Sequence, residues 1–133
     1  MKVFSAAVAA GVVMMMVSAG GCASKPAGLV SESELKQSRD SYSKLPIGTP
    51  RDEALAKLGA GNRVKLGSAA IDSAMIEEWK YEAFVDRDKG RELFVTFLYF
   101  CDGKLVDTSD TRIDFRNNAE LVTRWRGVAH RRD

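Results

Sequence analysis

Two cysteine thiols are the most reactive groups in this sequence, and their neighbours predict different chemistry for them. Cys22 directly follows the small residues Ala19-Gly20-Gly21, which are typical of the residues before the cleavage site of an export signal. Cys101 has no partner within the chain once Cys22 is modified. We expect Cys22 to be the site of covalent modification. We expect Cys101 to be a small buried apolar residue, with an intermolecular disulfide or a reactive thiol as alternatives.

Other chemical groups do not form a recognisable catalytic or metal-binding set. The single histidine, His130, lies in the terminal segment, and the sequence contains no cysteine or histidine pair at ligand spacing. The acidic pairs Glu77 with Glu78 and Asp86 with Asp88 fit solvated positions on a strand and in a turn. We therefore predict a protein that is not an enzyme and that binds no metal or cofactor.

Residues 1–21 have the build of an export signal. Lys2 gives a positive start, and the segment from Val3 to Val17 is almost entirely apolar. This apolar run is shorter than the roughly 18 to 20 residues that a membrane-spanning helix needs. Cleavage between Gly21 and Cys22 is the expected outcome.

The junction at Cys22 resembles the lipobox of bacterial lipoproteins, although Ala19 replaces the usual leucine. The resemblance implies that Cys22 is acylated with palmitate-like chains, which would attach the protein to a membrane that it does not span. An ordinary cleaved signal and an uncleaved anchor are the alternatives. In many bacterial lipoproteins an aspartate directly after the acylated cysteine retains the protein in the inner membrane, and this chain has Ala23 there. The resemblance therefore implies that the protein is located at the periplasmic face of the outer membrane. The periplasmic face of the inner membrane is the alternative location.

The residues after the signal suffice for one domain with a modest core. Removal of residues 1–21 leaves 112 of the 133 residues. The full sequence has 20 Lys and Arg against 18 Asp and Glu, and this near balance argues against a nucleic-acid partner. Basic residues do cluster at the end of the chain, and they are candidates for binding an anionic surface or, alternatively, part of a solvated tail: Arg124, Arg126, Arg131 and Arg132.

Local signals predict a tether followed by two helices. Residues 22–30 form the expected flexible tether, and residues 31–133 form the expected domain. Ser31 and Glu34 have capping-box spacing, which predicts a helix over residues 32–44. Thr49 and Pro50 favour the start of a second helix, which Gly59 ends.

The middle of the chain predicts antiparallel strands. A short strand candidate covers residues 63–66, a loop covers residues 67–73, and longer strands cover residues 74–85, 92–101 and 104–108. Met75, Trp79 and Tyr81 alternate with Glu78 and Lys80, so the acidic face is expected to be mostly wet. Asp102-Gly103 is a strong hairpin signal. The predicted fold is α+β, with two N-terminal helices packed on a three-stranded antiparallel sheet.

A short C-terminal helix over residues 119–126, capped by Asn118, is an additional candidate element. One interpretation is that this helix folds back over the apolar face of residues 92–101 and completes the core. The other is that an apolar surface stays open to a partner protein, formed by the candidate binding residues Phe94, Leu98, Phe100 and Trp125.

Three short motifs, in this order, resemble the SmpA/OmlA family of small outer-membrane lipoproteins. They are Gly48-Thr49-Pro50-Arg51-Asp52-Glu53-Ala54-Leu55 running into Leu58-Gly59, then Glu78-Trp79-Lys80-Tyr81, and Asp102-Gly103-Lys104-Leu105. The resemblance covers residues 41–108 and implies a non-catalytic protein that contacts other envelope proteins and supports outer-membrane assembly or integrity. Because a fold does not choose a function, two alternatives stay open. One is binding of an envelope lipid or polymer by the basic C-terminal segment, and the other is an inhibitor-like module that binds a protein.

Overall fold

The structure is a computed structural model that describes residues 27–131. Its elements follow one another in the order α2 (Glu32–Ser43), α3 (Arg51–Lys57), β1 (Asn62–Ile71), β2 (Ala74–Arg87), β3 (Gly90–Cys101), β4 (Lys104–Ser109), the 3₁₀ turn η3 (Phe115–Asn117) and α4 (Ala119–Ala129). The predictions for residues 1–21, for Cys22, for most of the tether and for Arg132 lie outside the described residues.

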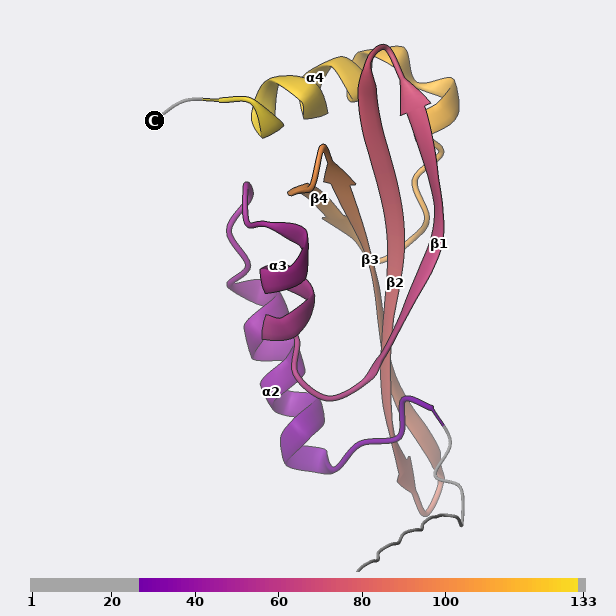
Figure 1. The fold of residues 1–133 in the computed structure, drawn as a ribbon. Coiled ribbons are helices and arrows are strands. Elements are labelled where there is room, and N and C mark those ends of the chain that lie inside the picture. Colours follow the sequence, from indigo (N-terminus) through magenta and orange to yellow (C-terminus); the bar gives the residue numbers. More distant parts are fainter. Residues whose placement is uncertain (1–26, 132–133) are drawn as a thin grey trace, which may run out of the picture.

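The four strands form one antiparallel sheet in the order β1-β2-β3-β4 (Figure 1). The predicted α+β class with an antiparallel sheet is confirmed, but the sheet has four strands where three were predicted. β1 is the additional full strand, because the predicted loop at 67–73 is mostly strand. A register shift between Lys65 and Gly67 lets β1 continue past Leu66 to a tight turn at Asp72-Ser73.

One face of the sheet carries α2 and α3. Leu35 of α2, Ala54 of α3 and Leu58 just after it are buried, and they share a core with residues from β2, β3 and β4. Figure 1 shows both helices on the same side of the sheet. The sheet residues of this core are Tyr81, Ala83, Val85, Leu98, Phe100 and Leu105.

The opposite face carries η3 and α4 at one end of the sheet, where α4 lies across it (Figure 1). The C-terminal helix exists, but it does not fold over Phe94, Leu98 and Phe100 as one interpretation expected. It packs on the side chains that alternate with them, because successive residues of a strand point to opposite faces. This second core combines Ile76, Tyr99, Cys101, Val106, Phe115, Leu121, Val122 and Trp125.

The chain just before α2 is attached to the edge of β2. The Val30 amide donates to the Phe84 carbonyl at 2.9 Å, and the Phe84 amide donates to the Gly28 carbonyl at 2.8 Å. Residues 28–30 of the predicted tether are therefore held against the sheet. The capping box of α2 is confirmed, since the Ser31 hydroxyl accepts from the Glu34 amide and the Glu34 carboxylate accepts from the Ser31 amide.

The loop before α3 is attached to the edge of β4. The Gly48 amide donates to the Leu105 carbonyl at 2.7 Å, and the Leu105 amide donates to the Thr49 carbonyl at 2.8 Å. Pro50 is the residue at the start of α3, and the Thr49 hydroxyl instead donates to the Pro46 carbonyl at 2.6 Å. None of the helices within residues 27–131 has the length and apolar character that crossing a membrane requires.

Candidate functional site

The four apolar residues proposed for partner binding lie in the core, not on one open surface. Leu98 and Phe100 are 0% exposed beneath α2 and α3, and Trp125 is 1% exposed on the other side of the sheet. Phe94 is half-buried, with its ring against Tyr42 and Tyr81 at centroid distances of 5.5 and 6.1 Å. These side chains stabilise two separate cores, so a partner surface must be sought elsewhere.

Glu78 is the most unexpected residue of the second core. Its carboxylate was predicted to be solvated, but only 2% of the residue is exposed. The Tyr99 hydroxyl donates to Glu78 Oε2 at 2.9 Å. Arg112 donates from Nη2 to Oε1 at 2.8 Å and from Nε to Oε2 at 3.2 Å. The prediction failed because alternation assigns Glu78 to the face opposite Trp79 but does not reveal that Tyr99 and Arg112 hold the carboxylate there.

The electrostatics of Glu78 follow from these partners. Burial on its own would raise the pKa of Glu78, but the hydrogen bonds from Arg112 and Tyr99 outweigh burial and hold it below its ordinary value. Burial raises the pKa of Tyr99 to about 12, so the phenol keeps its proton and acts as the donor at neutral pH. A shallow recess of about 220 Å³ borders this pair, lined by Glu78, Arg112, Ile113, Asp114 and Arg116. Because the Glu78 carboxylate is hydrogen-bonded to both Arg112 and Tyr99, its role is structural: it holds the segment after β4 against the sheet.

Glu77 makes a second network on the face of the sheet that carries α3. Its carboxylate accepts from Arg51 Nη1 at 2.9 Å and from the Trp79 indole at 3.0 Å, and Lys65 Nζ lies 3.8 Å away. Burial opposes ionisation, but the hydrogen bonds from Trp79 and Arg51 lower the pKa of Glu77 overall. The pair Glu77 and Glu78, predicted to be solvated, is therefore engaged on both faces of β2.

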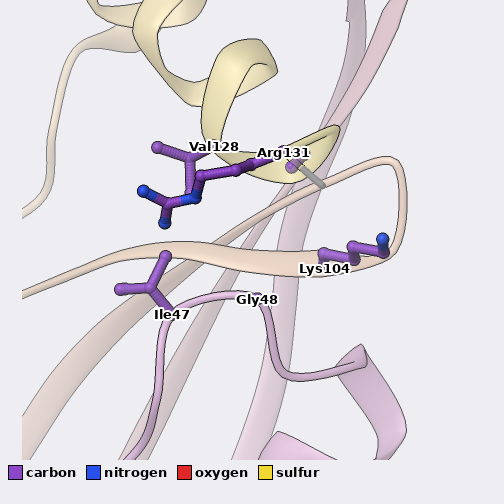
Figure 2. Close-up of a pocket in the computed structure, with 6 residues that line it drawn as sticks. Ile47, Gly48, Lys104, Val128 and Arg131 are labelled. Carbon is purple, nitrogen blue, oxygen red and sulfur yellow. The ribbon is translucent and has the colours of Figure 1, made fainter. Parts of the chain in front are cut away.

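The basic residues of the C-terminal segment are carried by α4 and the residues that follow it. Arg124 is exposed and Arg126 is half-buried within α4, while Arg131 follows the helix. Arg131 lines a recess of about 180 Å³ together with Ile47, Gly48, Lys104, Val128 and Ala129. Figure 2 shows the charged ends of Arg131 and Lys104 at opposite sides of this recess, so they do not converge on one anion.

His130 has a structural role at the end of α4. His130 Nε2 lies 2.7 Å from Asp102 Oδ2, and Asp102 Oδ1 accepts from the Met75 amide at 2.9 Å. These contacts join the end of α4 to the turn between β3 and β4.

Cys101 is a free cysteine with 0% exposure, and burial raises the pKa of its thiol to about 11. The thiol is therefore protonated and unreactive in the folded domain.

Within residues 27–131, no three side chains of His, Cys, Asp or Glu gather in a group that could hold a metal ion. Comparison of the chain with protein-family models, with characterised proteins and with solved structures finds no match. The resemblance to the SmpA/OmlA family therefore stays a prediction.

Proposed function

We propose that this chain is a non-catalytic, lipid-anchored envelope protein whose domain contacts other outer-membrane proteins and supports assembly or integrity of that membrane. The observation that carries the proposal is the junction Ala19-Gly20-Gly21-Cys22 at the end of an apolar leader. Two or three acyl chains on Cys22 would give a stable attachment, because one chain alone binds a membrane only marginally. The resemblance of residues 41–108 to the SmpA/OmlA family supports the outer-membrane location.

The chemistry of the domain supports a binding function over a catalytic one. Glu77, Glu78 and Asp102 are each held by hydrogen bonds from neighbouring elements, so these carboxylates are committed to the fold. A general base or nucleophile must be accessible to a substrate. These three carboxylates instead fasten α3, α4 and the sheet together.

Acylation is tested by metabolic labelling with palmitate in a bacterial host. The wild-type chain should be labelled, should fractionate with membranes and should accumulate as a larger precursor in globomycin. Cys22→Ala should lose the label, while the matched control Cys101→Ala should keep it, because only Cys22 follows the signal. Palmitate labelling of the Cys22→Ala protein would contradict the proposal.

The partner is tested by crosslinking in intact cells, followed by affinity purification from solubilised membranes. Subunits of the barrel-assembly machinery or other outer-membrane proteins should be recovered with the wild-type chain and depleted with Cys22→Ala. Recovery of none of them, under conditions that preserve known envelope complexes, would count against this function.

Exposed arginines at one end of the molecule favour a second candidate, the binding of an anionic envelope lipid or polymer. Arg124 and Arg131 are both exposed. Deleting residues 124–133 would remove half of α4 and its core residue Trp125, so substitution is the sharper test. Arg124→Gln with Arg131→Gln should weaken flotation of the non-acylated chain with anionic vesicles, whereas Lys36→Gln with Lys57→Gln should not. Equal flotation of both double variants would remove this candidate.

A further inference from the structure

The attachment of the domain to Cys22 lies at one end of the sheet. Gly28 and Val30 bond to Phe84, which lies close to the turn between β2 and β3. Figure 1 shows the described chain starting beside this turn, while α4 crosses the opposite end of the sheet. If Cys22 is acylated, as the proposed function requires, the turn end is the one next to the membrane.

Covalent reach limits how far this end can stand from the lipid. Gly28 is six residues after Cys22, so the two are separated by at most about 20 Å of extended chain. From Phe84 to Ala74 the strand β2 continues for ten residues, or about 33 Å at 3.3 Å per residue. The connection is therefore shorter than the sheet, and the turn end stays near the bilayer in any orientation.

The surface beside the attachment point suits a membrane interface. Leu93, the cross-strand partner of Phe84, is 50% exposed. The Arg91 guanidinium lies 4.0 Å from the centre of the Phe84 ring, and Phe84 also forms a bridge with Leu29. Phe84 itself is buried, at 4% exposure, so the surface consists of its neighbours, and we name Leu29, Arg91 and Leu93 the anchor-side patch. The adjoining turn carries both signs of charge, since Asp86, Asp88 and Glu92 stand among Arg87, Lys89 and Arg91. An exposed apolar side chain beside an arginine is typical of contact with lipid headgroups.

We propose that the anchor-side patch rests on the leaflet that holds the Cys22 acyl chains, and that α4 projects away from this leaflet. Leu93 enters the headgroup region, and Arg91 contacts lipid phosphates. Arg91 also forms an ion pair with Asp86 at 3.2 Å. This carboxylate offsets part of the attraction between Arg91 and a lipid phosphate. The recess beside Arg131 and the turn at Asp72-Ser73 then point away from the leaflet.

The orientation is tested with acylated protein in vesicles of phosphatidylethanolamine and phosphatidylglycerol that carry a headgroup-linked energy acceptor. A donor dye is attached at Lys89→Cys in one sample and at Ser73→Cys in another, two exposed turn positions at opposite ends of β2. Wild-type protein controls for dye on the buried Cys101. Energy transfer should be at least about threefold stronger from residue 89 than from residue 73. Equal or reversed transfer in vesicle-bound protein would overturn the orientation alone, whereas failure of the protein to acquire lipid would overturn the proposed function as well.

A pair of matched substitutions tests the patch itself. Leu93→Asp and Met75→Asp alter side chains that are 50% and 45% exposed, near opposite ends of the β2–β3 hairpin. Leu93→Asp should reduce transfer from residue 89 at least about twofold, and Met75→Asp should leave it unchanged. Circular dichroism confirms that each variant is folded. Unchanged transfer in folded Leu93→Asp would show that the patch does not contact lipid.

Discussion

Tyr99 and Glu78 are direct cross-strand partners on β3 and β2, and their side chains are joined by a 2.9 Å hydrogen bond in the second core. The same phenol oxygen accepts from the Ile113 amide at 2.7 Å. Arg112 then holds both oxygens of Glu78. One cross-strand pair thus fastens the connection between β4 and α4 onto the sheet.

Tyr99→Phe should be strongly destabilising although it removes a single oxygen atom. The change leaves the Ile113 amide without its acceptor and takes one donor from the buried Glu78 carboxylate. Loss of a hydrogen bond to a charged group predicts a decrease of about 1.5 to 3 kcal/mol in the free energy of unfolding. Urea denaturation measures it. Tyr42→Phe, at a half-buried tyrosine on the opposite face, is the control and should lower the free energy of unfolding by less. Equal decreases in the two variants would contradict the structural role of the Tyr99 and Glu78 pair.

The stability of the domain should fall in acid, and Glu78 should account for part of the fall. Its pKa is held below the ordinary value of 4.5 in the folded state, so the unfolded chain takes up the proton first. The stabilisation is complete above the unfolded pKa and is lost as the pH falls through the folded pKa. Glu78→Gln should therefore flatten the decrease in the free energy of unfolding between pH 6 and pH 3. An unchanged slope would mean that Glu77, Glu92 and Asp102, whose pKa values are also lowered, carry the effect without Glu78.

The parts of the fold that could be predicted depend on short-range chemistry. The capping box at Ser31 and Glu34 is satisfied within one helical turn, and the Asp102-Gly103 turn needs only its own backbone, with φ of 50° and 83°. The features that were missed depend on distant partners. The residues after Gly67 have weak strand propensity and are extended because β2 pairs with them. Glu78 can be buried because Arg112, 34 residues later, reaches its carboxylate.

The candidate binding residues show the same division. The residue types show that Phe94, Leu98, Phe100 and Trp125 are apolar. They do not show which element of the fold covers each face of the sheet. A strand that is apolar on both faces is covered twice. Helical periodicity alone does not say that α2 and α3 take one face and α4 the other.

Cys101 should be unreactive until the domain unfolds. Its thiol is fully buried, and its pKa is raised to about 11, so almost no thiolate exists near neutral pH. In Cys22→Ala protein, where Cys101 is the only remaining cysteine, labelling by a thiol reagent at pH 8 should be at least about 100-fold slower than in urea-unfolded protein. Rapid labelling of the native state would instead support the reactive-thiol alternative.

Two glycines should respond in opposite directions to the same added methyl group. Gly61 has φ of +137°, and a Cβ there would lie 2.6 Å from the ring carbon Cζ of Tyr81. The Tyr81 ring cannot easily yield, because its hydroxyl lies 2.7 Å from Ser38 Oγ and donates to the Leu58 carbonyl at 3.1 Å. Gly61→Ala should therefore lower the free energy of unfolding by about 2 to 4 kcal/mol, from backbone strain and overpacking together.

Gly127 lies within α4, where nothing stands within 4 Å of an added Cβ and φ needs no glycine. Gly127→Ala should raise the free energy of unfolding by about 0.5 to 1 kcal/mol, because alanine loses less backbone entropy in a helix. Urea denaturation of the two variants against wild type measures both signs in one experiment. Stabilisation by Gly61→Ala would place the Tyr81 ring elsewhere, and destabilisation by Gly127→Ala would mean that α4 is covered on that side.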